Sequence, residues 1–154
     1  MPSAADRIEK QIVVPAPVER VWRALTDVRE FNAWFGVALT SPFTPGAEVS
    51  GPITIDGYTH VTATLWVERM DAPHHFSLRW HPYAIDPAVD YADEPTTLIT
   101  FTLDAVAEGT RLTVVESGFD AIPEHRRHAA FTSNSGGWAE QLKNVRAWVE
   151  RHPA

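Results

Sequence analysis

The chain has 154 residues and a mass of 17.2 kDa, a length at which a single hydrophobic core is usual. Hydrophobic residues make up 44% of it, which excludes a disordered chain, and the lack of cysteine excludes disulfides, thiolate metal sites and a cysteine nucleophile. A formal net charge of -7 argues against nucleic acid and anionic membrane surfaces as partners.

The first elements are a strand and two helices. Residues 7–14 alternate with a period of two, which predicts a strand ended by two prolines. Pro17 is well placed in the first turn of a helix, and Val18, Val21, Trp22 and Leu25 follow at helical spacing. A second short helix is predicted around residues 29–35.

After Gly36 short apolar segments separated by proline and glycine predict a run of hairpins. Six further strands are expected, over residues 37–42, 47–55, 59–69, 75–81, 97–105 and 110–117. Asp56-Gly57 and Glu108-Gly109 supply turns in which the glycine can adopt a positive φ. The acidic, proline-bounded segment 83–94 is too polar for either regular structure and is a candidate lid.

The last element predicted is a long helix that begins near Pro123 and reaches residue 152. Trp138, Leu142, Val145 and Val149 share one of its faces and predict a buried stripe. Two glycines between Ser133 and Gly137 each cost roughly 1 kcal/mol relative to alanine in a helix, so a break there is left open.

This order of elements predicts an α+β fold. A curved antiparallel sheet of about seven strands would enclose the long C-terminal helix, with two short helices after the first strand. We expect one domain spanning residues 1–154, and a cytoplasmic protein, because the sequence has no signal-peptide core and no apolar stretch of about 18 residues. Curling the sheet leaves space between it and the helix.

Several short motifs, taken in order, resemble a known family. They are the helix with Pro17, Val21, Trp22 and Leu25, the pairs Trp34-Phe35 and Pro45-Gly46, the strand ending in Phe76 to Trp80, the hairpin at Gly109 to Leu112, the segment Glu116 to Phe119, and Gly137-Trp138 with Leu142. The sequence resembles, over essentially its whole length, the family named for activator of heat-shock protein 90 ATPase homologue 1. That family belongs to the START-like or SRPBCC superfamily.

The resemblance implies the helix-grip fold, whose members include lipid and hormone carriers, polyketide aromatases and cyclases, and co-chaperone-like modules. Fold alone does not choose among these functions. The co-chaperone that names the family has an additional N-terminal domain that binds the chaperone. The helix-grip domain accounts for this whole sequence, so a chaperone partner is not expected.

Period-two alternation places Phe76, Leu78 and Trp80 on one face of their strand, which we assign inward. By the same count Ile99, Phe101 and Leu103 share a face, as do Leu112, Val114 and Glu116. Glu116 is the one acid on an otherwise apolar face. Burying an unpaired acid is costly, so the residue needs a partner or access to water. It is either a ligand anchor or general base, or a structural acid bonded to a neighbour such as a tryptophan N–H.

We therefore expect a cavity between the sheet and the last helix. The candidate ligand-binding residues are those on the inferred inner faces: Trp22, Phe31, Trp34, Phe35, Phe76, Leu78, Trp80, Ile99, Phe101, Val114, Glu116, Phe119, Trp138 and Leu142. Core packing is the alternative for the aromatic residues. His60 and Trp66 are reserves that would face the cavity if a bulge shifted their strand by one residue.

No metal site is expected, because His125 and His128 lack a third fixed ligand and the carboxylates of the acidic loop lack EF-hand spacing. No P-loop, dinucleotide or nucleophile-elbow motif occurs, and no cofactor is predicted. The sequence predicts a protein that binds a hydrophobic or aromatic small molecule. The alternatives are a cyclase or aromatase with Glu116 as the only candidate catalytic residue, and a co-chaperone-type interaction module. A homodimer is left open.

Overall fold

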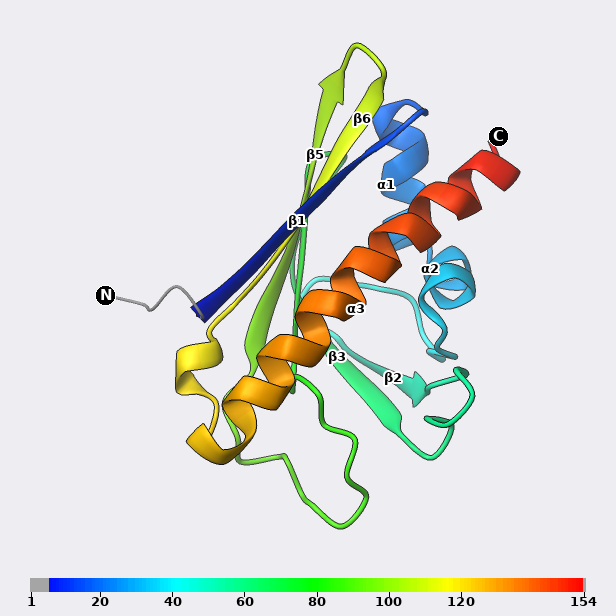
Figure 1. Cartoon of the computed structure of the whole chain (residues 1–154). Coiled ribbons are helices and arrows are strands. Elements are labelled where there is room, and N and C mark those ends of the chain that lie inside the picture. The colour runs from blue at the N-terminus through cyan, green and yellow to red at the C-terminus, as the bar shows by residue number, and fades with distance from the viewer. Residues whose placement is uncertain (1–5, 154) are drawn as a thin grey trace.

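The computed structural model describes residues 6–153, and its main element is a six-stranded antiparallel sheet (Figure 1). The strands run in the order β1-β6-β5-β4-β3-β2, so β2 to β6 form a meander and β1 pairs with the last strand. Their bounds are β1 Arg7–Val14, β2 Glu48–Pro52, β3 Thr62–Asp71, β4 His75–Trp80, β5 Thr97–Val106 and β6 Gly109–Ser117.

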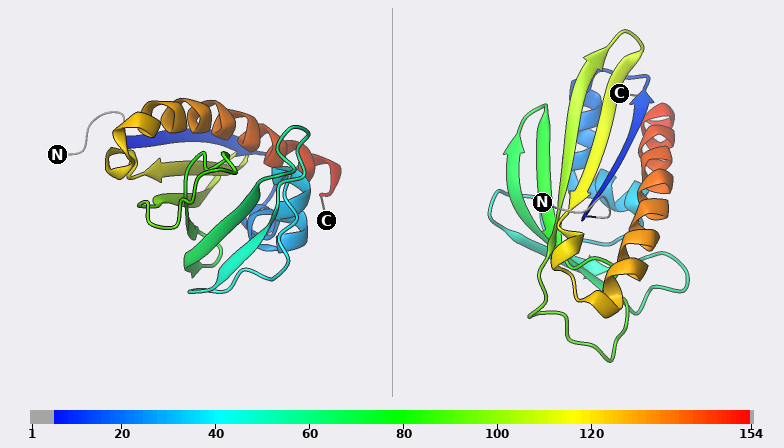
Figure 2. Two further views of the ribbon diagram at one scale, coloured as in Figure 1. Left: turned by 90° about the horizontal axis from the view of Figure 1, so that it is seen from below. Right: turned by 60° about the vertical axis from the view of Figure 1, so that its left-hand side comes forward.

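The sheet curls around the long helix α3, Glu124–Arg151 (Figure 2). Trp138 is only 3% exposed, and Leu142, Val145 and Val149 are buried with it against the sheet, which confirms the predicted stripe. The helix continues without a break through Ser133 to Gly137. The α+β helix-grip fold predicted from the sequence is therefore the fold of the protein.

The register places the predicted inner faces together. Ile99 on β5 lies opposite Glu116 on β6 and Leu78 on β4, and Phe101 lies opposite Val114 and Phe76. All six side chains are essentially buried, so the period-two assignment of these strands is confirmed. Glu116 is the one ionisable group of this set.

The sheet has six strands and not the seven expected, because segment 37–42 does not form one. Its N–H groups at Ala38 and Thr40 donate to the carbonyls of Pro52 and Ser50, but proline has no N–H with which to return a bond. Only an isolated bridge between Val37 and Ile53 remains.

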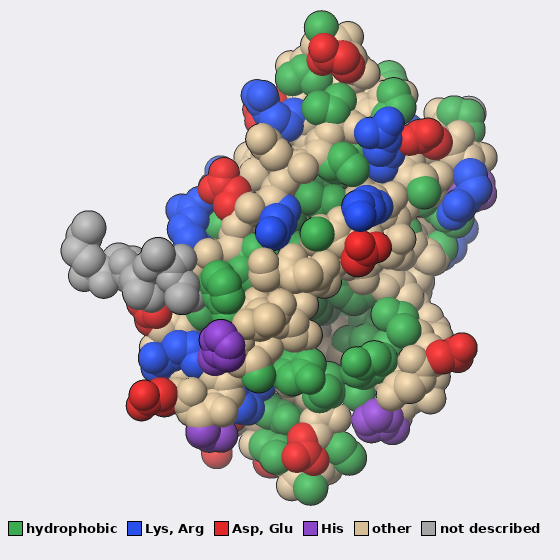
Figure 3. Space-filling view, viewed as in Figure 1, with side chains coloured by type: hydrophobic (Ala, Val, Ile, Leu, Met, Phe, Trp, Pro, Cys, Tyr) green, Lys and Arg blue, Asp and Glu red, His purple; other side chains and the backbone are tan. Residues whose placement is uncertain are grey.

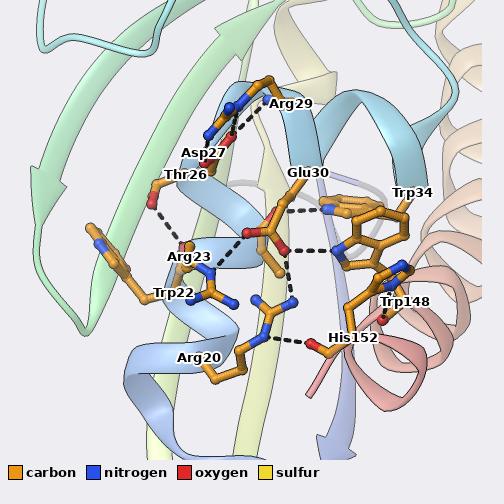
Figure 4. Close-up of polar contacts among 11 residues, drawn as sticks. Arg20, Trp22, Arg23, Thr26, Asp27, Arg29, Glu30, Trp34, Trp148 and His152 are labelled. Carbon is orange, nitrogen blue, oxygen red and sulfur yellow. Dashed lines mark hydrogen bonds and ion pairs between the residues drawn. The ribbon is translucent and has the colours of Figure 1, made fainter. Parts of the chain in front are cut away.

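Helices α1, Val18–Thr26, and α2, Val28–Phe35, are joined to the end of α3 by a partly buried ion-pair cluster (Figure 4). Glu30 accepts from Arg20 Nη2 and Trp148 Nε1, each at 2.8 Å, and from Arg23 Nε at 2.9 Å. Arg20 Nε also donates to the carbonyl of His152. This cluster fixes the C-terminal end of α3. The first half of the helix extends over the other end of the sheet.

Candidate functional site

A cavity of about 990 Å³ opens beside the first half of α3. Its walls come from α2, from β2 and β3 with the connection between them, from the end of β4 with the following loop, and from α3 at Ser133 to Gln141. Figure 3 shows hydrophobic side chains gathered around a hollow below the helix. This volume lies at the upper end of the range typical of small-molecule sites, about 300–1,000 Å³.

The inner end of the cavity is apolar, and large apolar side chains are also exposed at its mouth. Phe35 and Trp80, whose rings meet edge to face at 6.0 Å, lie at the inner end with Ile53. Ile55 and Tyr58 line the mouth and are 45% and 42% exposed. Large apolar side chains at the rim of a hollow are typical of a binding surface.

The cavity reaches both faces of β3, because β4 leaves that strand early. Pairing between the two strands begins at Trp66 with Arg79, so the first residues of β3 have no partner on β4. Ala63, on the face of buried Leu65, and Thr64 with Trp66, on the opposite face, all line the cavity. Trp66 thus lines the cavity without the register slip on which its reserve status depended, since the bulge lies beyond it, between Val67 and Arg69.

The loop between β4 and β5, residues 81–96, forms the lower wall and contains the segment interpreted as a lid. Arg126 in the first turn of α3 holds both ends of this loop. Its Nη1 donates to the carbonyls of Pro82 and Tyr83 at 2.9 and 3.1 Å, and its Nε and Nη2 donate to Glu94 Oε1 at 3.0 and 2.8 Å. The guanidinium also lies 4.8 Å from the ring centre of Tyr91.

Glu116 is fully buried behind this cavity and is surrounded by hydrogen-bond donors. Its Oε2 accepts from Trp80 Nε1 at 2.7 Å and from the Thr97 hydroxyl at 2.6 Å. Its Oε1 accepts from Trp138 Nε1 at 2.8 Å, and the amide of Asn134 reaches both oxygens at 3.0 and 3.2 Å. These contacts agree with the structural interpretation of the acid, including the tryptophan N–H.

Burial in this apolar core raises the pKa of Glu116 above its ordinary value. Hydrogen bonds from Thr97, Trp80, Trp138 and Asn134 favour the ionised form and oppose that rise without cancelling it. The carboxyl group has dipolar donors but no cation among its hydrogen-bond partners. Burial therefore disfavours the charge of this acid, and four fixed dipoles offset that effect only in part.

Few of the residues predicted to bind a ligand line the cavity. Phe35 and Trp80 do, and Trp138 lines a smaller hollow of about 90 Å³ that adjoins the same residues. Trp22 is half-buried, with its ring 6.2 Å from that of Phe76. The others are packed in the core and line neither space: Phe31, Trp34, Phe76, Leu78, Ile99, Phe101, Val114, Glu116, Phe119 and Leu142. His60, the other reserve, is exposed and outside the cavity.

The sequence reasoning missed most of the lining. Residues 53–55 and 59–61, which were predicted to belong to strands, lie instead in the connection between β2 and β3, and the loop around Tyr83 and Tyr91 shows no regular period that assigns a face. The sequence did offer a hint for Gly137, because a glycine in the interior of a helix lowers its stability and so suggests a local reason for the missing side chain. A Cβ built on it meets no atom within 4 Å, so the missing side chain leaves room for the cavity.

In the described range 6–153, no three histidine, aspartate or glutamate side chains come together to hold a metal ion. None of the helices within that range is both long and apolar enough to cross a membrane.

Solved structures of similar fold include three that match over nearly the whole chain. DynU16, described as a protein in the dynemicin biosynthetic locus, has 26% identity and a TM-score of 0.72 over 94% of this chain. The chain spans about half of DynU16, 47% of its length. A protein from Arthrobacter aurescens has 20% identity and a TM-score of 0.78, with 96% of this chain and 87% of that one covered. A protein from Nitrosomonas europaea has 18% identity and a TM-score of 0.76, with 98% of each chain covered.

A search of the curated proteins found no match to the sequence. The model of one protein family does match, over residues 15–150. Its description is activator of Hsp90 ATPase homologue 1-like protein, and proteins of this START-like fold commonly bind hydrophobic ligands. Because the match extends over most of the chain, the protein belongs to the activator of Hsp90 ATPase homologue 1-like family.

Proposed function

We propose that the protein binds a hydrophobic or aromatic small molecule in the cavity beside α3. The observation that carries this proposal is the cavity itself: about 990 Å³, apolar at its inner end around Phe35 and Trp80, and open to solvent between Ile55 and Tyr58. Each 100 Å² of apolar surface removed from water there would contribute about 2.5 kcal/mol before ordering costs.

The lining favours a flat ligand without negative charge. The inner end offers aromatic faces and edges, and the walls offer hydroxyl groups at Tyr58, Thr64 and Tyr91. Among the described lining residues the one guanidinium, that of Arg79, is already paired with Glu68 at 2.7 Å. An anionic ligand would therefore have to displace an ion pair. The likeness to DynU16, a protein of a biosynthetic locus, supports a small-molecule ligand over a protein partner.

The alternative in which Glu116 moves a proton for a cyclase-type reaction has less support. A general base must lie within hydrogen-bond reach of the substrate. Glu116 lines neither space, and protein donors already occupy both of its oxygens. We assign it a positioning role.

Titration with N-phenylnaphthylamine, a neutral probe whose fluorescence rises in apolar surroundings, tests the proposal. We expect saturable binding, a blue-shifted emission and a raised melting temperature, because a ligand that binds only the native state stabilises it. Thermal-shift screens with flavonoids, polyketides and lipids extend the test to natural chemistries. Absence of saturable probe binding together with no stabilisation across the screen would refute the proposal.

A further inference from the structure

The side-chain amide of Asn134 is held in one orientation. Its Nδ2 lies 3.0 Å from Glu116 Oε1 and 3.2 Å from Oε2. Rotating the amide by half a turn would place Oδ1 against the carboxylate, acceptor against acceptor, and lose both contacts. Glu116 itself cannot turn away, because Trp80, Thr97 and Trp138 hold its two oxygens.

The oxygen of the same amide is left open. Asn134 Oδ1 makes no hydrogen bond to residues 6–153, and in that range Nη1 of Arg20 is the single buried side-chain polar atom that lacks a partner. Oδ1 is therefore accessible to solvent. Asn134 lines both the large cavity and the small hollow next to it, so the residue that carries this free acceptor is part of the proposed binding site.

We propose that Asn134 is a specificity-determining residue, which accepts a hydrogen bond from a hydroxyl or N–H group of the ligand, and that Glu116 is the positioning residue that fixes it as an acceptor. This inference rests on the proposed function and narrows its ligand class. A neutral aromatic molecule with a phenolic hydroxyl or a ring N–H fits the site, whereas the corresponding ether or hydrocarbon leaves Oδ1 without a partner.

The location of the amide strengthens the assignment. Asn134 lies one helical turn before Trp138, and both donate to the same carboxylate from α3. Trp80, which also donates to Glu116, forms part of the aromatic inner end of the cavity. One buried acid thus orients an aromatic wall and a polar acceptor, so that a ligand stacked near Trp80 has Oδ1 at its edge.

The test compares naphthol with its methyl ether, methoxynaphthalene, in displacement of N-phenylnaphthylamine. The two differ by the donor proton and one methyl group. We expect naphthol to bind the wild-type protein about tenfold more tightly, the size of one net hydrogen bond. In Asn134→Leu the ratio of the two affinities should fall to about one. Lys143→Leu, a polar-to-leucine change at an exposed site of α3 that does not line the cavity, should keep the wild-type ratio.

Glu116→Gln provides a second variant. Loss of one carboxylate oxygen lets the Asn134 amide turn, so the ratio should shrink although Asn134 is intact. Because the readout is a ratio, a general loss of packing would not change it. Equal affinities for the two compounds in the wild type, or a ratio that persists in Asn134→Leu, would overturn the inference. The proposed function would still stand in that case, provided that the probe binds. If neither compound nor the probe binds the wild type, both fail together.

Discussion

Trp138 on α3 donates its indole N–H to Glu116 on β6 across 2.8 Å, inside a core in which Glu116 is the one ionisable residue facing inward from β5 and β6. The same carboxylate accepts the indole N–H of Trp80 on its other oxygen. Helix and sheet are thus joined through one buried acid at the inner end of the proposed binding site. The orientation of the cavity's aromatic wall depends on that acid.

Replacing Glu116 should lower stability in proportion to the donors that lose an acceptor. Glu116→Gln keeps one oxygen, so one indole N–H faces an amide, and we expect a loss of about 1–3 kcal/mol in the free energy of unfolding. Glu116→Leu removes both oxygens and should cost more. Urea unfolding measures both, with Glu68→Gln at an exposed ion pair as the control, expected within about 0.5 kcal/mol of wild type. Equal stability of all three variants would contradict the assigned role.

Stability should depend on pH in opposite directions through two glutamates. Since burial raises the folded-state pKa of Glu116, the folded protein holds its proton more tightly than the unfolded chain. Its stabilising contribution is complete below the unfolded value of about 4.3 and is lost as pH rises through the folded pKa. The stability of wild type relative to Glu116→Gln should therefore fall as pH rises above about 4.3.

Glu30 should behave in the reverse way. Burial acts to raise its pKa, but hydrogen bonds from Trp148 and Arg20 and the charge of Arg20 outweigh burial and lower it. Its contribution is present above about pH 4.3 and is lost as pH falls through the folded pKa. The gap between wild type and Glu30→Gln should close in acid. Urea unfolding at a series of pH values between about 3 and 8 distinguishes the two profiles. A profile that runs opposite to its prediction would refute the assignment of that glutamate.

The loop at residues 81–96 should open when Arg126 is replaced. Arg126→Met keeps the length of the side chain but removes its bonds to Glu94 and to the carbonyls of Pro82 and Tyr83. We expect faster amide hydrogen exchange throughout this loop and faster binding and release of the probe. Arg146→Met, which removes an exposed pair with Glu150 on the same helix, is the matched control. Unchanged exchange in the loop would mean that other contacts hold it.

The sequence predicts the fold better than it predicts the site, for physical reasons that particular residues make clear. Alternation placed Ile99, Phe101 and Val114 inward, because a buried face leaves a period of two in any strand. The same reasoning assumed that inward residues line the cavity, yet these three are packed against other side chains. A period identifies the face, but it does not show where along the face the packing fails.

The cavity forms where regular pairing ends, and pairing is a property of two segments. The departure of β4 from β3 before Trp66 depends on the path of loop 81–96, which Arg126 holds from a distant part of the sequence. The missing strand is a second example. The sequence shows that Pro52 lacks an N–H, but it does not show that Pro52 lies opposite Ala38. Glu116 was identifiable because an acid breaks an apolar pattern by itself.

The most direct measurement of the central claim compares probe binding by Gly137→Leu and Gly136→Leu. Both glycines lie inside α3 with no atom within 4 Å of a built Cβ, so a Cβ fits at either position and both variants gain helix propensity. Residue 137 lines the cavity and residue 136 does not. We expect affinity for N-phenylnaphthylamine to fall about tenfold or more in Gly137→Leu, because the leucine occupies ligand space, and to remain at the wild-type value in Gly136→Leu. Undiminished binding by a folded Gly137→Leu variant would place the ligand elsewhere and contradict the account.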